Sequence, residues 1–410
     1  MYRIAARRHI EKLRAEGLYR VFHPHRRPVN GFPRIRSGGG SEICWCSNDY
    51  LNMSHHPKVI RAGVVALERE GVGAGGTRNI SGNLTSVVEL ESRIAAFHRK
   101  ERGLVFNSGF SANVGALRAL GTLLPDAMLL SDADNHASMI DGIRQSGLEK
   151  KIWRHNDVAH LTELLEAQPL DRPKVIVMES LYSMDGSTAP LREITKLARR
   201  YDAMTYVDEI HAVGLYGKGG RGRGELEGCI NDIDILQGGF GKGFGTQGGY
   251  IVGDDEIVDA IRTVAKSFIF TTSNSNVITE ATMTSVDLVE HEMDEARVQM
   301  FERVNETKTR LTAMGFTVMC DEPTHIVPVF VGDAFECKRI TQALLERGHY
   351  IQPIQYPTVP RDSARLRITP TYKHTSEMIE SLCADLDEIT GPQVAYRRQI
   401  HGSRNRTPRV

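Results

Sequence analysis

Three side chains have the chemistry to hold an aromatic ring that carries an aldehyde: Lys242, Asp208 and His136. Lys242 lies in the glycine-rich segment GGFGKGFG, and a lysine amine can form a Schiff base with an aldehyde. Asp208 ends an apolar run, so its carboxylate would be desolvated and would need a cationic partner such as a protonated ring nitrogen. Pyridoxal phosphate has the aldehyde, the ring nitrogen and the phosphate that this set could bind. The other interpretation is an ordinary surface ion pair between Asp208 and Lys242.

A sheet predicted from apolar runs would position these residues. The runs at 104–106, 128–130, 175–178, 204–207 and 233–236 are separated by stretches with helical patterning, which is typical of a mainly parallel sheet. In such sheets, ligands bind beyond the carboxyl ends of the strands. Polar residues follow every one of these runs: Ser108, Ser131, Glu179, Asp208 and, after several glycines, Lys242.

The pattern along the chain predicts four segments. Residues 1–45 contain an amphipathic helix, with Ile10, Leu13 and Leu18 near helical spacing, and a connector rich in Pro, Gly and Arg. Residues 46–290 carry the alternating runs of the large domain. Residues 291–392 combine long helices with HIVPVFVG and RLRIT, which predicts a smaller α+β domain. Residues 393–410 form a basic tail that is predicted to be disordered.

Composition excludes several classes of protein. The chain has 410 residues with 51 Lys and Arg against 51 Asp and Glu, which gives no electrostatic reason to bind nucleic acid or a membrane surface. The six scattered cysteines contain no C-x-x-C pair, so no metal site is predicted and a reducing compartment is favoured. The amino terminus lacks the apolar core of a secretory signal, and Glu11 and Glu16 argue against a mitochondrial presequence. A cytoplasmic enzyme is therefore favoured over a mitochondrial matrix one.

Two glycine clusters, at 71–76 and 217–222, satisfy G-x-G-x-x-G. A dinucleotide site would require a strand before such a cluster and an apolar helix after it. The first cluster follows a charged helical stretch, and the second runs into sequence rich in Arg and Glu. Both are therefore predicted to be turns or substrate loops. The chain also contains no G-x-x-x-x-G-K-[ST] loop, which argues against a nucleoside triphosphatase.

Several longer stretches carry a family resemblance. They include SNDYL, GGTRNISG, RHNDVAHL, YVDEIHAVG and the segment from YPTVPR to LRITP. With these stretches, the chain resembles the 5-aminolevulinate synthases, in the α-oxoamine synthase group of fold-type-I pyridoxal-phosphate enzymes, from about Leu13 to Leu386. The resemblance implies an α/β transferase with a mainly parallel seven-stranded sheet, helices on both faces, and a smaller α+β carboxy-terminal domain.

The resemblance also implies a role for each matching residue. Lys242 would hold the cofactor as a Schiff base and move the substrate proton, and Asp208 would pair with the ring nitrogen. His136 would stack on the ring, while His211 and Ser183 would hydrogen-bond the ring oxygen. The phosphate would be bound by main-chain donors of Ser108, Gly109 and Phe110, with Thr271 and Thr272 of a second subunit. The glycine carboxylate would be bound by Asn48 and Arg367, and the succinyl carboxylate by Arg20, Thr77 and Asn79. Succinyl-CoA would be contacted by Ser131, Lys150 and Thr358.

Some of these residues have a plainer interpretation. Arg20 could be a surface arginine, and His136 could cap a helix. Thr271 and Thr272 could form an ordinary turn. Ser131 and Lys150 could be solvated surface residues.

The chain also departs from the family pattern at three places. Gly239 replaces a threonine that would donate to the phosphate, which predicts weaker cofactor retention. Asn52 replaces a glycine, and Asp362-Ser363-Ala364 replaces Gly-Thr-Glu near Thr358 in the substrate lid. The last change is expected to alter turnover and lid kinetics more than the type of reaction.

The implied reaction joins glycine to succinyl-CoA and gives 5-aminolevulinate, CoA and CO2 in a homodimer, for tetrapyrrole or secondary-metabolite synthesis in a bacterial cytoplasm. Two alternatives are another α-oxoamine synthase that uses a different acyl-CoA, such as a 2-amino-3-ketobutyrate CoA ligase-like enzyme, and a noncatalytic relative. Arg20, Thr77 and Asn79 favour a carboxylated acyl group, and intact Lys242 and Asp208 argue against a noncatalytic protein.

Overall fold

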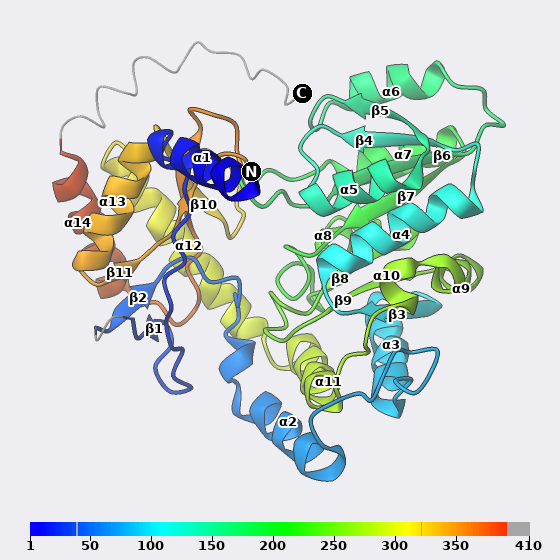
Figure 1. Cartoon of the computed structure of the whole chain (residues 1–410), viewed down its shortest axis with the longest axis horizontal. Coiled ribbons are helices and arrows are strands. Elements are labelled where there is room, and N and C mark those ends of the chain that lie inside the picture. The colour runs from blue at the N-terminus through cyan, green and yellow to red at the C-terminus, as the bar shows by residue number, and fades with distance from the viewer. Residues whose placement is uncertain (38–39, 321, 392–410) are drawn as a thin grey trace. The chain divides into compact units, whose positions relative to one another are not determined.

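The computed structural model describes residues 1–37, 40–320 and 322–391, which form two compact units (Figure 1). Of the described residues, 48–182 and 188–297 make up the larger unit, and 1–37, 40–47, 183–187, 298–320 and 322–391 make up the smaller one. The basic tail predicted for 393–410 lies outside the described residues. The four-segment division of the sequence stays a prediction. Across the described ranges, each helix is too short or too polar to cross a bilayer.

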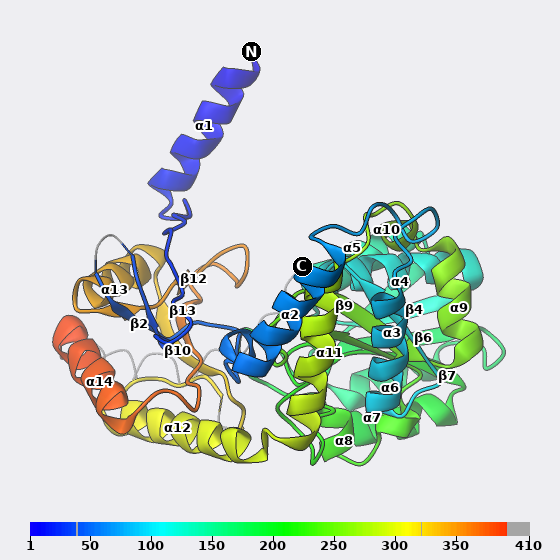
Figure 2. The same cartoon turned by 90° about the horizontal axis from the view of Figure 1, so that it is seen from below.

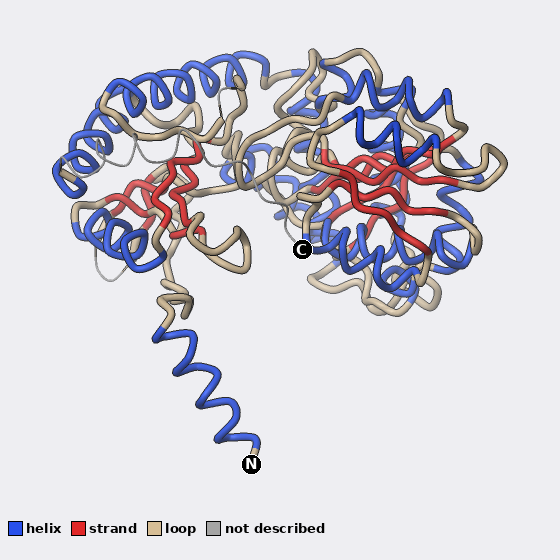
Figure 3. Tube along the Cα trace, turned by 90° about the horizontal axis from the view of Figure 1, so that it is seen from above, coloured by secondary structure: helices blue, strands red, loops and turns tan. Residues whose placement is uncertain are grey.

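Strands form a sheet at the centre of the larger unit (Figure 3). The sheet has seven strands in the order β3-β9-β8-β7-β6-β4-β5. Strand β9 is antiparallel to β3 and β8, and the neighbouring strands from β8 to β5 are parallel. This confirms the mainly parallel sheet expected from the sequence. The strands are β3 (Arg102–Phe106), β4 (Met128–Asp132), β5 (Glu149–Trp153), β6 (Lys174–Glu179), β7 (Ala203–Asp208), β8 (Ile235–Gly239) and β9 (Gly249–Gly253).

Helices cover both faces of this sheet (Figure 2). On one face, α4, α5, α9 and α10 pack on a buried cluster that includes Leu129, Val177 and Tyr206. On the other, α6 and α7 lie against β5 and β7, and α3 lies against β3. The helices are α2 (Pro57–Glu70), α3 (Thr85–His98), α4 (Gly109–Leu123), α5 (Ala137–Ser146), α6 (Val158–Glu166), α7 (Leu191–Arg200), α8 (Arg223–Leu226), α9 (Asp255–Val264), α10 (Lys266–Ile269) and α11 (Asn276–His291), with 3-10 turns at Met53–His55 and Ile230–Asp232.

Four of the five predicted apolar runs lie within strands, and the fifth is displaced. The run at 233–236 was expected to be a strand from its first residue, whereas β8 begins at Ile235. The reason is a side-chain pairing: Asp234 accepts from the Thr205 N–H at 2.7 Å, and the Thr205 hydroxyl accepts from the Asp234 N–H at 2.9 Å. These bonds replace the strand pairing at Asp234.

The smaller unit contains two three-stranded sheets, β1-β2-β11 and β10-β13-β12. Its core includes Trp45, Leu344 and Leu366, all 1% exposed or less. This α+β architecture agrees with the expected smaller domain. The elements are α1 (Tyr2–Ala15), β1 (Arg34–Ile35), β2 (Glu42–Cys44), most of α12 (Asp294–Ala313), β10 (Val327–Gly332), α13 (Ala334–Glu346), β11 (His349–Tyr350), β12 (Pro353–Ile354), β13 (Ala364–Ile368) and α14 (Ser376–Thr390).

The amino-terminal helix differs from its sequence prediction. Helix α1 forms, but none of its residues is buried, and Ile10 is 38% exposed. The helix ends at Ala15, so Leu18 lies beyond it; its N–H turns back to the Leu13 oxygen at 2.8 Å. Leu18 is buried at 7% exposure. The apolar residue that anchors this segment therefore follows the helix and is not part of an amphipathic stripe.

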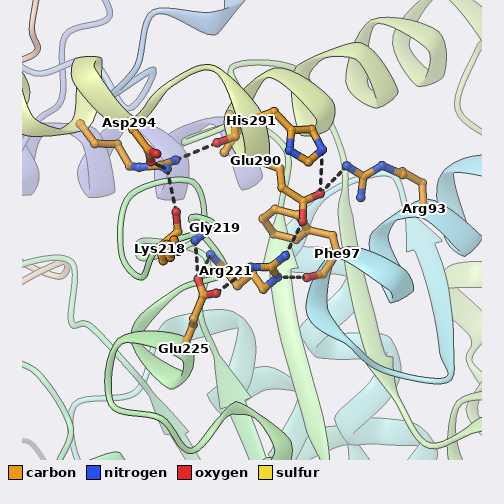
Figure 4. A network of polar contacts seen from close by, with 11 residues as sticks. Arg93, Phe97, Lys218, Gly219, Arg221, Glu225, Glu290, His291 and Asp294 are labelled. Atoms are coloured by element: carbon orange, nitrogen blue, oxygen red, sulfur yellow. Dashed lines mark hydrogen bonds and ion pairs between the residues drawn. The ribbon is translucent and has the colours of Figure 1, made fainter.

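Arg221, in the loop between β7 and α8, fixes that loop to two helices (Figure 4). Its guanidinium donates to the Phe97 oxygen of α3, to Glu225 at 2.6 Å and to Glu290 of α11. Arg93 donates to the second oxygen of Glu290 at 2.6 Å. The side chains of Arg221 and Glu225 are each 12% exposed, so little water screens their charges.

Replacing Arg221 with Met should lower the free energy of unfolding by about 3 kcal/mol, because the buried Glu225 loses its counter-ion. Arg199→Met serves as the control, since Arg199 is 65% exposed in its pair with Asp232 and should change stability by less than about 1 kcal/mol. Urea titrations of both variants measure the difference. Equal losses in the two variants would contradict the anchoring role.

Candidate active site

Lys242 begins a hydrogen-bonded chain that runs through His211 and Tyr50 to Asn48. Nζ of Lys242 is 2.6 Å from Nε2 of His211, and Nδ1 of His211 is 2.8 Å from the Tyr50 hydroxyl. That hydroxyl donates to Oδ1 of Asn48 at 3.2 Å. An ammonium group has donors only, so Nε2 accepts from it and a neutral His211 carries its proton on Nδ1. The structure therefore brings three of the predicted site residues together through Tyr50.

Asp208 ends β7 with 3% of its surface exposed, and two donors hold its carboxylate. The Ile210 N–H donates to Oδ1 at 2.8 Å, and Nδ2 of Asn113 donates to Oδ2 at 2.7 Å. Asn113 is fixed in turn, because its Oδ1 accepts from the Tyr206 hydroxyl at 2.8 Å. These bonds compensate the buried carboxylate and set its orientation at the carboxyl edge of the sheet.

His136 is the N-cap residue of α5. Its Nδ1 accepts from the Ser138 N–H at 3.2 Å, and the Ser138 hydroxyl accepts from Asn113 at 3.0 Å. Burial lowers the pKa of His136; Asp208 opposes this shift and Lys242 adds to it. The ring is therefore uncharged near neutral pH. The contacts agree with the plainer interpretation of a helix cap, and stacking on a cofactor stays a prediction.

The start of α4 offers main-chain donors to an anion. Ser108 caps the helix: its hydroxyl accepts from the Ser111 N–H at 3.1 Å, and its own N–H donates to the Ser111 hydroxyl at 3.0 Å. The N–H groups of Gly109 and Phe110 open the helix and have no acceptor within it. Of the three predicted phosphate donors, these two suit an anion better, because the Ser108 N–H is already engaged.

The phosphate and succinyl segments predicted for the larger unit lie side by side. Thr77 and Thr272 form an isolated antiparallel bridge. The Thr77 hydroxyl donates to Oδ1 of Asn79 at 2.6 Å. The Thr272 oxygen accepts from Asn107 at 2.8 Å, so the Thr271-Thr272 segment also contacts the loop before α4. What these threonines bind stays a prediction.

Four predicted residues belong to the smaller unit, where they form two pairs. Nε of Arg367 donates to the Ser183 oxygen at 2.7 Å, and Arg367 is 5% exposed. The Arg20 guanidinium donates to the Thr358 hydroxyl at 2.8 Å on the surface. Ser183 was expected to hydrogen-bond the ring oxygen together with His211. Ser183 belongs to the smaller unit, whereas His211 belongs to the larger one.

Ser131 and Lys150 occupy different settings. Ser131 is buried in β4, where its hydroxyl accepts from Asn135 at 3.0 Å, so the solvated-surface interpretation is wrong for this residue. Lys150 is exposed on the edge strand β5. Ser131 pairs in register with Ile152, so Lys150 lies two residues nearer the amino end of β5 than that partner. Their contact with CoA stays a prediction.

Two departures from the family pattern share a backbone conformation. Asn52 has a φ of 52° and Asp362 has a φ of 58°. Both values lie in the left-handed region, which glycine adopts without steric strain. Asn and Asp tolerate this region better than other residues with a side chain. The backbone therefore keeps the turn that a glycine would form at each position.

Sequence reasoning gave no role to Tyr50 and Asn113. Tyr50 lies within SNDYL, so the stretch that carried the resemblance held the signal. Asn113 is a polar residue between Ala112 and Ala116 on the buried side of α4. A buried polar residue among small apolar ones needs a hydrogen-bond partner, and that requirement could have indicated the contact with Asp208.

Glu209, next to Asp208, ties the end of β7 to α8. It is fully buried and accepts from the Ser180 hydroxyl at 2.6 Å, the Gly224 N–H at 2.7 Å and the Arg223 N–H at 3.0 Å. Burial raises the pKa of Glu209 to about 7, although these hydrogen bonds oppose the shift. Its charge therefore changes close to neutral pH.

Comparison with known proteins places the chain in a family. The family model described as aminotransferase class I and II matches residues 41–386. The 5-aminolevulinate synthase of Rickettsia conorii is 45% identical over 389 residues, covering 95% of this chain and 94% of the relative. That of Bradyrhizobium diazoefficiens is 46% identical over 385 residues, covering 93% and 94%. The chain belongs to the aminotransferase class I and II family, in its 5-aminolevulinate synthase branch.

A solved structure agrees with this family. A serine palmitoyltransferase from S. paucimobilis with bound PLP matches the chain with a TM-score of 0.85 at 29% identity, covering 96% of this chain and 98% of that one. The likeness confirms the fold-type-I architecture that the sequence resemblance implied.

The raised pKa of Glu209 can be tested by measuring how the stability of the fold changes with pH. The folded-state pKa of about 7 lies above the ordinary 4.5, so the folded chain binds more protons than the unfolded chain between these values. This contribution to stability is full below pH 4.5 and is lost as the pH rises through 7. Relative to Glu209→Gln, the free energy of unfolding should therefore fall by about 3 kcal/mol over that range.

Denaturant titrations at several pH values measure this difference, with Glu193→Gln as the control because Glu193 is an exposed acid on α7. The control should show no such slope. A difference between the native chain and Glu209→Gln that is flat or rises with pH would contradict the assignment.

Proposed function

We propose that the chain catalyses the condensation of glycine with succinyl-CoA, giving 5-aminolevulinate, CoA and CO2, with pyridoxal phosphate as cofactor. One observation carries the proposal: the Lys242 amine lies against His211 in the same unit as the buried carboxylate of Asp208. The 45–46% identity to 5-aminolevulinate synthases over nearly the whole chain supports the choice of substrates.

The residues of the larger unit fit pyridoxal phosphate. Lys242 offers an amine for the aldehyde, and Asp208 offers a buried, oriented carboxylate for the ring nitrogen. The first N–H groups of α4 offer donors for the phosphate. When bound, the cofactor supplies a ring that takes up the electron pair left by a proton leaving the glycine α-carbon.

The chain's own residues hold the substrates and move protons. The Lys242 amine takes the proton from the glycine α-carbon and later returns one to the product; His211 orients that amine at 2.6 Å. Asp208 keeps the proton on the ring nitrogen. Arg367 and Asn48 bind the glycine carboxylate, and the planar guanidinium of Arg367 suits a two-point contact.

Recognition of the acyl group is assigned to Arg20, Thr77 and Asn79 through the succinyl carboxylate. Thr77 and Asn79 are already oriented toward each other by a hydrogen bond of 2.6 Å. Ser131, Lys150 and Thr358 are proposed to contact CoA. A site built for a carboxylate rejects an acyl group that lacks one, because its polar groups would remain unpaired.

We propose that the enzyme acts as a homodimer, with Thr271 and Thr272 completing the phosphate site of the partner subunit. Large apolar side chains near these threonines are exposed: Phe270 at 74% and Ile80 at 81%. In the proposed dimer, these apolar side chains would belong to the surface that the partner subunit covers. A cytoplasmic location fits the six unpaired cysteines.

Replacing Lys242 with Ala should abolish formation of 5-aminolevulinate, because the change removes the amine that is proposed to take the α-proton. Product analysis from glycine with succinyl-CoA, acetyl-CoA or palmitoyl-CoA tests both the reaction and the acyl group. Lys196→Ala is the control, since Lys196 is exposed on α7 and should retain full activity. Turnover by Lys242→Ala, or a preference for an uncharged acyl-CoA, would refute the proposal.

The expected effect of Gly239 on cofactor retention depends on its neighbour. A Cβ at Gly239 would lie 2.5 Å from Cδ1 and 2.6 Å from Cγ1 of Ile210. A Cβ at Gly109 would lie 2.4 Å from the same Cδ1, so Ile210 contacts both the end of β8 and the start of α4. A threonine at 239 therefore requires Ile210 to move before its hydroxyl can reach the phosphate.

Gly239→Thr alone should leave the affinity for pyridoxal phosphate unchanged or weaker. In an Ile210→Ala background, the same change should tighten binding about tenfold, because one hydrogen bond to a charged group is then gained without a clash. Fluorescence titration of the four proteins measures the dissociation constants. Equal tightening in both backgrounds would contradict the coupling between Ile210 and position 239.

A further inference from the structure

Asn113 on α4 joins two parts of the candidate site through one side-chain amide. Its Nδ2 lies 2.7 Å from Oδ2 of Asp208 and 3.0 Å from the hydroxyl oxygen of Ser138 on α5. Its Oδ1 lies 2.8 Å from the Tyr206 hydroxyl. Asn113, Ser138 and Tyr206 are each 1% exposed or less, so the protein itself must satisfy their polar groups.

The carboxylate of Asp208 fixes which way this amide faces. An ionised carboxylate has acceptors only, so the amide atom beside it must be the nitrogen with its two hydrogens. The amide oxygen then faces Tyr206, whose hydroxyl donates to it. One hydrogen of the amide nitrogen is directed to Asp208, and the other is left for the Ser138 oxygen. Both hydrogens of the Asn113 side chain are thus used.

The Ser138 hydroxyl carries this direction on to His136. Its oxygen accepts from Asn113, so its single hydrogen is left for Nδ1 of His136, which lies 2.7 Å away. The Ser138 N–H donates to the same nitrogen at 3.2 Å. A ring nitrogen that faces two donors carries no proton of its own. In neutral His136 the ring proton therefore lies on Nε2.

We propose that Asn113 is a positioning residue with two effects: it orients the Asp208 carboxylate and, through Ser138, it keeps the ring proton of His136 on Nε2. The inference rests on the proposed function, in which Asp208 pairs with the nitrogen of the cofactor ring and His136 stacks on that ring. One amide on a helix then sets both the carboxylate and the imidazole that the ring contacts.

Two substitutions and a control separate these effects. Asn113→Leu has a similar volume and removes the donors to both Asp208 and Ser138. Ser138→Ala removes the hydroxyl that reaches His136 and leaves the contact between Asn113 and Asp208 in place. Ser146→Ala is the control, because Ser146 lies at the other end of α5 and its hydroxyl donates within that helix.

Nuclear magnetic resonance of the histidine rings tests the tautomer on cofactor-free protein, at about pH 8, where an ordinary histidine is neutral. With labelled histidine, the ring shifts show which nitrogen carries the proton, and His136→Gln identifies the His136 signal by its loss. The native chain and Ser146→Ala should hold the Nε2–H form alone. Asn113→Leu and Ser138→Ala should each place the proton on Nδ1 in about a tenth of the molecules or more, because Nδ1 then loses a directed donor.

Because no cofactor is present, this result stands whether or not the proposed function is correct. A native His136 with its proton on Nδ1 would overturn the assignment of the tautomer. An unchanged tautomer in Asn113→Leu or in Ser138→Ala would overturn the effect of Asn113 on His136. If Asn113→Leu does not fold, Asn113→Ala takes its place, and Ser138→Ala still decides the question.

Titration with pyridoxal phosphate tests the effect on Asp208. Asn113→Leu should bind the cofactor about tenfold more weakly than the native chain, because the Asp208 carboxylate loses one of the two donors that hold it. Ser138→Ala keeps that donor and should bind within about threefold of the native chain. Native affinity in Asn113→Leu, or an equal loss in Ser138→Ala, would overturn the orienting role. Failure of the native chain to bind the cofactor would refute the proposed function separately and would leave the tautomer result in place.

Discussion

Asp208 is buried, with only 3% of the residue exposed. A carboxylate buried to this extent must be compensated by polar contacts. The compensation comes from Ile210 on the same loop and from Asn113 on α4. Asn113 is held in turn by the Tyr206 hydroxyl of β7. The orientation of the site thus depends on satisfying one buried anion.

Helix α4 links two parts of the proposed cofactor site. Its first residues present main-chain donors at Gly109 and Phe110, and Asn113, about one turn further on, holds Asp208. The helix packs on the sheet through Ala112, Ala116 and Leu117, which are completely buried. Small side chains on this face allow a close approach of helix and sheet. The spacing between phosphate donors and ring carboxylate is therefore built into a single rigid element.

The sequence predicted the parallel sheet because buried strands such as 175–178 and 204–207 are continuous apolar runs. It did not reveal β5, whose sequence EKKIW reads as charged because the strand lies at the sheet edge. Strand β9, bounded by glycines, was also missed. Among the site residues, Lys242 and Asp208 were predicted from their chemistry. Tyr50 was given no role, although it lies within SNDYL, because its contact with His211 joins chain segments far apart in sequence.

The pairing of β3 has a consequence for the order in which the chain is assembled. β3 lies at one edge of the sheet, and its neighbour β9 follows it in the sequence by well over a hundred residues. As the nascent chain leaves the ribosome, β3 and the first turn of α4 emerge long before their partner exists. Closing so long a loop is slow, and an unpaired strand edge can meanwhile recruit other chains. The start of α4, which is proposed to bind the phosphate, is thus synthesised early in translation but takes its final shape late.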